Sequence, residues 1–301
     1  MNFRITDNLT NKNFSSRIND QRTRISVLQE RLASGKRINR PSDDPAGAEA
    51  VINLKTSIEQ IEQFQRSATA AGQRLTAADD TLSGYEHILE RIRVLVSQGL
   101  SDTTTQESRD IIATEVETLR GRILDLANSK YGDDYLFGGT RQGSPPFDPN
   151  TGVPSAIPSN AQYLQIEPGA NAIAVGITGE SFLTDSTSDI FTDLDSALAA
   201  LRGTGNPTAD HTTLQNTFSR LDVYSDLVGN AHARVGANLN ITEFSQERLN
   251  TDHLSLEERS AEIEGADFAD TAIELTQQQQ ALDATLQVVA RGRRSLFDFL
   301  G

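Results

Sequence analysis

Apolar residues recur near the N-terminus at alternating steps of four and three positions. The positions of this stripe are Phe14, Ile18, Gln21, Ile25, Leu28 and Leu32. Such spacing places two side chains in every seven on one face of an α-helix, which is the pattern of a coiled-coil seam. It predicts an N-terminal amphipathic helix whose apolar stripe is narrow and contains one polar residue.

A longer heptad pattern runs from Pro45 to Gln98 and predicts a helix about 80 Å long. Its positions include Val51, Leu54, Ile58, Ile61, Leu75, Ala78, Leu82, Tyr85, Leu89, Ile92 and Val96. A polar turn follows at 99–105, where Thr103 or Thr104 fits the first position of a capping box. A third helix is predicted by the stripe Ile112, Val116, Leu119, Ile123 and Leu126.

The segment that joins the first two helices, residues 31–50, carries the signals of a hinge. Gly35 suits the left-handed position that ends a helix, and three basic residues follow it within five positions. Asp44 can cap the next helix, and Pro45 suits the first helical position because its missing N–H costs nothing there. Two interpretations remain open: a solvated helix–turn–helix, and a docking surface between copies of the chain.

The composition changes over residues 138–210, which contain seven of the nine prolines and many glycines. Residues 163–166 and 172–177 have the pattern of short strands joined across Pro168-Gly169. A short helix is expected at 193–201. This segment therefore predicts a small β-rich insert.

Helical heptads resume after the insert. Their positions are Leu214, Phe218, Leu221, Val228, Val235, Leu239 and Leu249, then Phe268, Ala272, Leu275, Gln279, Leu282, Leu286, Val289, Arg293, Leu296 and Leu300. The sequence thus predicts a mainly α fold with a small β-rich insert. Long antiparallel heptad helices from both chain ends form a rod, with the β domain at its outer end. The expected domains are 1–43, 44–137, 138–210, 211–264 and 265–301.

The stripes of the two terminal helices are too thin to form a thick core. Gln21, Gln279 and Arg293 all fall on stripe positions, and polar residues there lower stability while they specify register. Ordering each residue costs on the order of 1–2 kcal/mol, which a narrow stripe offsets poorly. We infer that these helices are marginal in the monomer and become ordered when neighbouring copies cover them. An ordinary intramolecular bundle is the alternative.

Composition and charge exclude several classes of function. Only 37% of the 301 residues are hydrophobic, and none is cysteine, which excludes disulfides and zinc–sulfur sites. No apolar run is long enough for a membrane span, and the N-terminus lacks the apolar segment of a secretory signal. Residues 1–40 hold nine Lys/Arg and three Asp/Glu in a chain of net charge −15. This basic arm fits self-association better than nucleic-acid binding, because its only aromatic residues are Phe3 and Phe14.

Candidate chemistry is scarce. The four histidines (His87, His211, His232 and His253) form no close pair in sequence and are expected on helix surfaces or seams. The acidic groups at 133–134 and 185–195 lack the glycine and closing glutamate of an EF-hand, which favours solvated turns. The sequence contains no GxGxxG, P-loop or GxSxG motif. We therefore expect no enzyme activity, no catalytic or metal-binding residue and no cofactor.

Three segments resemble the flagellin superfamily. They are LASGKRINRPSDDPAGAEA at 32–50, YLFGGT at 135–140 with Pro146-Phe147 after it, and QQQQALDATLQVVARGRRSLFDFL at 277–300. The resemblance covers roughly the first 147 and last 90 residues. The pairs Arg40-Pro41 and Asp44-Pro45 are more similar to the hook–filament junction proteins of this superfamily than to flagellin. The resemblance implies a flagellin-like rod whose insert points outward.

The same resemblance implies a non-enzymatic ring of copies of this chain. The ring links the hook, through the first hook-associated junction protein, to the flagellin filament. It implies export by the flagellar type III apparatus into the extracellular flagellum, and a cytoplasmic export chaperone that binds the terminal helices before assembly. No nucleic acid or membrane partner is expected. Flagellin itself, or a cytosolic coiled-coil binding module of a different class, are the alternatives.

Two sets of residues carry these expectations. The loop that contacts a neighbouring subunit is Arg37, Asn39, Pro41, Asp43, Asp44 and Pro45. The terminal-helix seam that forms the inner tube is Phe14, Ile18, Ile25, Leu28 and Leu32 with Leu275, Leu282, Leu286, Val289 and Leu296.

Overall fold

A computed structural model describes residues 3–141, 143–155, 159–185 and 187–300, without the side chains of 3–11, 289 and 291–300. The chain forms two compact units. The terminal unit contains residues 1–60 and 252–301, and the central unit contains residues 61–251. The fold is mainly α with a small β-rich insert, as the sequence predicts, and the described residues form two small antiparallel sheets.

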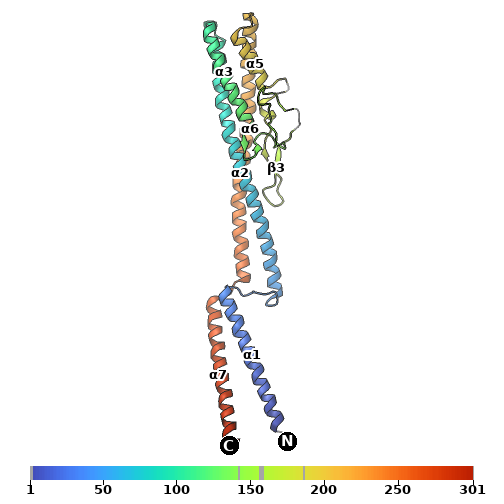
Figure 1. The fold of residues 1–301 in the computed structure, drawn as a ribbon, viewed down its shortest axis with the longest axis vertical. Helices are drawn as coiled ribbons and strands as arrows, with labels where there is room; N and C mark the ends of the chain where they lie inside the picture. Colours follow the sequence, from blue (N-terminus) through green and yellow to red (C-terminus); the bar gives the residue numbers. More distant parts are fainter. Residues whose placement is uncertain (1–2, 142, 156–158, 186, 301) are drawn as a thin grey trace. The chain divides into compact units, whose positions relative to one another are not determined.

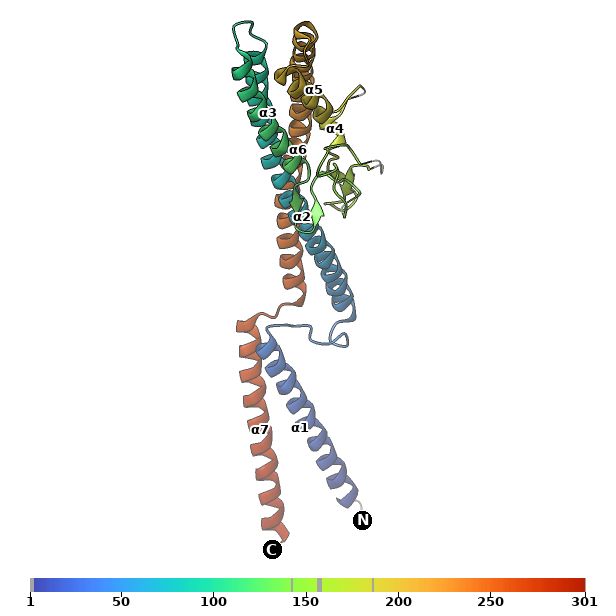
Figure 2. The same ribbon diagram turned by 45° about the horizontal axis from the view of Figure 1, so that its top comes forward.

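The terminal unit pairs the two ends of the chain. Helices α1 (Phe3–Ser34) and α7 (Phe268–Leu300) lie side by side and run antiparallel (Figures 1 and 2). In both views they are closest where α1 ends and α7 begins, and they diverge toward the other end. The predicted stripe of α1 is confirmed as its least exposed face: Leu28 is buried and the other five positions are half-buried.

The central unit is built on long parts of α2 (Pro45–Gly99) and α6 (Pro207–Glu264), together with α3 (Gln106–Ala127) and α5 (Ile190–Arg202). The first two helices also supply residues to the terminal unit. The predicted turn at 99–105 is confirmed, but the cap is Thr105 and neither Thr103 nor Thr104. Its side chain accepts a hydrogen bond from the Ser108 amide, so α3 begins one position beyond the capping-box pattern.

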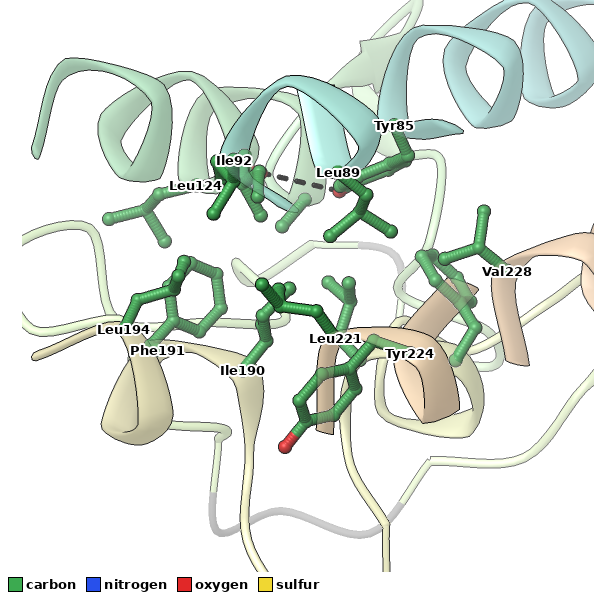
Figure 3. Close-up of a cluster of buried hydrophobic side chains, with 14 of the residues drawn as sticks. Tyr85, Leu89, Ile92, Leu124, Ile190, Phe191, Leu194, Leu221, Tyr224 and Val228 are labelled. Atoms are coloured by element: carbon green, nitrogen blue, oxygen red, sulfur yellow. Dashed lines mark hydrogen bonds between the residues drawn. The ribbon is translucent and has the colours of Figure 1, made fainter. Parts of the chain in front are cut away.

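One hydrophobic core joins these four helices. Figure 3 shows Tyr85, Leu89 and Ile92 from α2 and Leu124 from α3 facing side chains of α5 and α6. The Phe182 ring packs edge-to-face against Tyr85 at 5.5 Å and Phe137 at 5.1 Å between ring centroids. Phe182 lies in α4 (Glu180–Leu183), within the insert. Side chains of the insert therefore complete the core of the central unit.

The β-rich insert is confirmed, with shorter strands than expected. β3 (Gln162–Leu164) and β4 (Ile173–Gly176) pair antiparallel, and Gly169 between them has a φ of +70°. The expected helix at 193–201 begins earlier, at Ile190, because the Asp189 side chain accepts a hydrogen bond from the Thr192 amide at 3.0 Å and caps it.

A second hairpin was not predicted. β1 (Lys130–Tyr131) and β2 (Asp134–Tyr135) are two residues each and pair antiparallel. The buried guanidinium of Arg74, on α2, donates to the carbonyl oxygens of Tyr135 at 3.2 Å and Leu136 at 3.1 Å. Burial lowers the pKa of this arginine. Arg74 therefore fixes the start of the YLFGGT segment to the long helix.

Candidate assembly surfaces

The hinge loop begins where the sequence predicts. Gly35 has a φ of +69°, and its amide donates to the Arg31 carbonyl at 2.8 Å, which ends α1. Lys36 then forms an isolated antiparallel β-bridge with Gly265, in the connection between α6 and α7. The Arg37 amide donates to the Glu264 carbonyl at 2.7 Å, and the Ala266 amide donates to the Gly35 carbonyl at 3.0 Å.

The two aspartates of the loop hold its backbone. The Asp43 carboxylate accepts from the amides of Asn39 at 3.1 Å and Arg40 at 2.9 Å. The Asp44 carboxylate accepts from the Gly47 amide at 3.0 Å, which confirms the predicted cap of α2. This hydrogen bond and the nearby Arg37 guanidinium lower the pKa of the Asp44 carboxyl. Both acids stabilise the local fold, whether or not a neighbour contacts them.

Four of the six predicted loop residues present surface for a neighbour. Arg37, Pro41, Asp43 and Pro45 are exposed, whereas Asn39 and Asp44 are half-buried. Arg37 also has contacts within the chain, because it donates to the Asp44 carboxylate at 3.3 Å and to the Ile263 carbonyl at 3.0 Å. The loop is therefore an ordered turn with an accessible outer edge.

Sequence reasoning missed a charged group beside the loop. The Glu264 carboxylate lies 2.9 Å from the Lys36 ammonium and 3.1 Å from the Lys55 ammonium. Partial burial opposes ionisation of Glu264, but the hydrogen bonds from both lysines outweigh it and lower its pKa. The pairing joins residues 228 positions apart, and no local sequence pattern reports such a contact.

The α7 face that lies against α1 differs from its apolar stripe. Leu275 and Leu282 are half-buried, as are the polar Gln278 and Thr285. Leu286 is 38% exposed and Phe268 is 68% exposed, so these two stripe positions lie outside the intramolecular contact. The predicted positions Val289, Arg293, Leu296 and Leu300 lie outside the residues whose side chains the structure describes.

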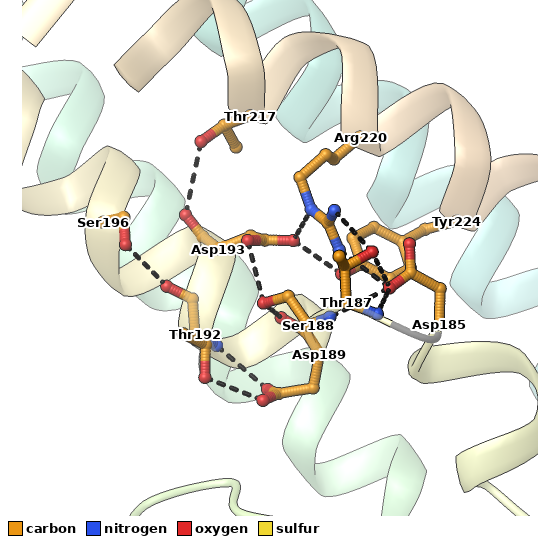
Figure 4. A network of polar contacts seen from close by, with 10 residues as sticks. All are labelled: Asp185, Thr187, Ser188, Asp189, Thr192, Asp193, Ser196, Thr217, Arg220 and Tyr224. Carbon is orange, nitrogen blue, oxygen red and sulfur yellow. Dashed lines mark hydrogen bonds and ion pairs between the residues drawn. The ribbon is translucent and has the colours of Figure 1, made fainter.

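The acidic segment 185–195 is not the solvated turn that the sequence suggests (Figure 4). The Arg220 guanidinium on α6 pairs with the carboxylates of Asp185 and Asp193, and the Tyr224 hydroxyl donates to Asp193 at 2.6 Å. Amides of Thr187 and Ser188, followed by Arg220, hold the pKa of Asp185 well below its usual range. The local sequence pattern does not indicate that Arg220 pairs with these acids. It therefore could not predict that Asp185 and Asp193 form a structural ion-pair network.

The described residues contain no cluster of histidine and acidic side chains that could hold a metal ion. Among the described helices, none is long and apolar enough to cross a membrane.

One histidine is more than a surface residue. The His232 ring on α6 lies 2.9 Å from the Glu86 carboxylate and 3.1 Å from the Asp79 carboxylate, both on α2. The hydrogen bond to Glu86 raises the pKa of His232, although partial burial opposes it, and Asp79 adds to the increase. The protonated ring therefore bridges two helices of the central unit.

This bridge predicts a pH dependence. Since the folded-state pKa is raised, the stabilisation is fully present below the ordinary value of about 6.5 and is lost as the pH rises through the folded-state pKa. We expect His232→Gln to lower the free energy of unfolding of the central unit more at pH 5.5 than at pH 8.5. Urea unfolding at both pH values measures this difference. Equal losses at the two pH values would contradict the prediction.

Comparisons with known proteins agree on one family. Residues 5–142 match the model of the bacterial flagellin N-terminal helical region. Flagellar hook-associated protein 3 of Salmonella typhimurium is 27% identical over 211 residues, which cover 66% of this chain and 67% of the relative. Its Escherichia coli counterpart is 26% identical over 279 residues, 85% of this chain and 86% of the relative.

The fold has a solved counterpart. The crystal structure of FlgL from Xanthomonas campestris matches with a TM-score of 0.63 at 18% identity, covering 69% of this chain and 99% of that one. The solved structure thus shares the fold of this chain. The chain contains the bacterial flagellin N-terminal helical region at residues 5–142 and is similar to hook-associated protein 3 over as much as 85% of its length.

Proposed function

We propose that this chain is a structural component of the bacterial flagellum at the junction between hook and filament. The observation that carries the proposal is its similarity to hook-associated protein 3 over 85% of the chain. The architecture agrees with it, because the buried apolar side chains pack into a core of long helices. The proposed role is non-enzymatic.

A deletion of the gene tests this function. We expect cells that keep their hooks, lack filaments and release flagellin into the medium. The specific alternative is a filament subunit, which the flagellin match over residues 5–142 favours. Hooks that still carry filaments after the deletion would reject the junction role, and loss of the main filament protein from purified flagella would support the alternative.

In the proposed assembly, copies form a ring that contacts the first hook-associated junction protein on one side and flagellin on the other. Export through the flagellar type III apparatus brings the chain to the extracellular flagellum. A cytoplasmic chaperone covers the exposed stripe of α7 before export. The exposure of Phe268 and Leu286 supports this part of the proposal, since neither side chain has a complete apolar partner surface within the chain.

The two predicted surfaces have separate roles in this assembly. The outer edge of the loop, with Arg37, Asn39, Pro41, Asp43, Asp44 and Pro45, contacts a neighbouring copy. The half-buried stripe of α1 and the exposed stripe of α7 pack against terminal helices of other copies in the inner tube. Support comes from the ordered backbone of the loop and from the incomplete burial of both helices.

Asp44→Lys tests the loop contact. The change removes the cap of α2 and places a positive charge at the positive end of that helix. We expect weaker assembly and reduced motility, with the melting temperature of the central unit unchanged. Asp80→Lys, an equal charge change at an exposed position of α2, is the control and should assemble normally. If Asp44→Lys also lowered the melting temperature of the central unit, the assembly defect could be explained by unfolding. That result would contradict a role at the interface.

A further inference from the structure

The two connections that lead to the terminal helices are hydrogen-bonded to each other. We call the paired segments Gly35–Arg37 and Glu264–Ala266 the joint. Two backbone hydrogen bonds cross it, from the Arg37 amide to the Glu264 carbonyl at 2.7 Å and from the Ala266 amide to the Gly35 carbonyl at 3.0 Å. The joint begins directly after the last residue of α1 and ends two residues before the first residue of α7.

Side chains reinforce the joint from three segments. Glu264 accepts from Lys36, which follows α1, and from Lys55, which lies in α2. Arg37 reaches across to the Ile263 carbonyl at 3.0 Å. A partly buried carboxylate that pairs with two cations fixes the position of the α6 end more firmly than a single exposed ion pair does.

Burial in the terminal helices is greatest beside the joint. Leu28 near the end of α1, Thr271 near the start of α7 and Ile38 in the loop are the buried residues here, at 4%, 9% and 6% exposure. Farther along the described parts of α1 and α7, stripe positions such as Ile18 and Leu282 are only half-buried. The pairing of the two helices is therefore best formed where the joint holds their ends together.

We propose that the joint couples the ordering of α1 to that of α7, so that covering one helix helps to order the other. The physical reason is proximity: holding the two helix ends side by side makes their pairing an intramolecular event with a short tether. A partner that orders one helix then leaves a smaller entropy cost for the second. The use of this coupling during assembly rests on the proposed function, but the coupling itself belongs to the isolated chain.

Gly265 offers a substitution that opens the joint. A Cβ atom at this position would lie 2.5 Å from the backbone carbonyl oxygen of Ala261, so Gly265→Ala must displace the connection. Gly236→Ala is the matched control, because a Cβ there meets nothing within 4 Å. A milder second variant, Glu264→Gln, removes only the charge, and Glu262→Gln is its control at an exposed position two residues away.

Amide hydrogen exchange of the full-length chain measures the coupling. We expect Gly265→Ala to speed exchange both in the last turns of α1 and in the first turns of α7. The factor should be about fivefold or more, since one net hydrogen bond shifts an opening equilibrium by about that much. Glu264→Gln should also speed exchange in both helices. The controls Gly236→Ala and Glu262→Gln should leave the exchange rates of both helices unchanged. Exchange in α5 reports that the central unit remains folded.

Two results would overturn the proposal: unchanged exchange in both helices, or faster exchange in α7 with α1 at the wild-type rate. In either case the junction function would stand, because the deletion experiment tests that function without reference to the joint. Conversely, the exchange experiment could show coupled helices while deletion of the gene leaves filaments intact. Those results would reject the junction function and support the proposed coupling through the joint.

Discussion

Phe182→Ala is expected to lower the free energy of unfolding of the central unit by about 3–5 kcal/mol. The ring is fully buried, and it packs edge-to-face against both Tyr85 and Phe137. Removing the ring leaves a cavity between the insert and α2. The closely packed rings of Tyr85 and Phe137 cannot easily move to fill it. Urea unfolding followed by circular dichroism measures the loss.

Phe244→Ala is the control for this change. Phe244 lies on α6 in the same unit and is 67% exposed, so its truncation should cost less than about 0.5 kcal/mol. Equal effects of the two substitutions would mean that the insert is not part of the core. Exchange in α1 and α7 should be the same in both variants, because neither residue belongs to the terminal unit.

Asp193→Ala should destabilise the central unit by about 3 kcal/mol, the second largest effect that we expect. The carboxylate accepts from the Tyr224 hydroxyl at 2.6 Å and from the Ser188 hydroxyl at 3.0 Å, and it pairs with the Arg220 guanidinium (Figure 4). Its removal leaves partly buried donors without their acceptor, and the cost of an unmatched buried group exceeds the net value of the pair.

The same unfolding experiment tests Asp193→Ala, with Asp226→Ala as the control at an exposed position of α6. We expect the control to stay within about 0.5 kcal/mol of wild type. If Asp193→Ala were equally mild, the acidic segment would be a surface turn after all, as the sequence alone suggests.

Periodicity explains why so much of the helical fold could be predicted. The α1 stripe from Phe14 to Leu32 repeats at heptad spacing, and the same positions form its least exposed face. The roles of Gly35 and Asp44 could also be predicted, because a left-handed helix end and a helix cap each depend on one residue and its immediate neighbours.

The features that escaped prediction depend on partners far away in the sequence. Glu264 pairs with Lys36 across 228 positions, and Arg74 binds carbonyl groups 61 and 62 positions later. Neither contact leaves a periodic signal. The sequence suggests a solvated turn at Asp185 and Asp193 for the same reason, because their partner Arg220 lies on α6, far away in the sequence. On α7, the polar Gln278 and Thr285 are half-buried, whereas the apolar Leu286 is exposed.

The central claim is that the terminal helices expose an apolar surface that other copies of the chain complete. Hydrogen exchange of the purified full-length chain over a range of concentrations tests it most directly. At low concentration we predict fast exchange in α1 before Ile25 and in α7 after Leu282, slow exchange in the central unit, and protection of both helices as copies associate. Terminal helices as protected as the central unit, at rates independent of concentration, would contradict the claim.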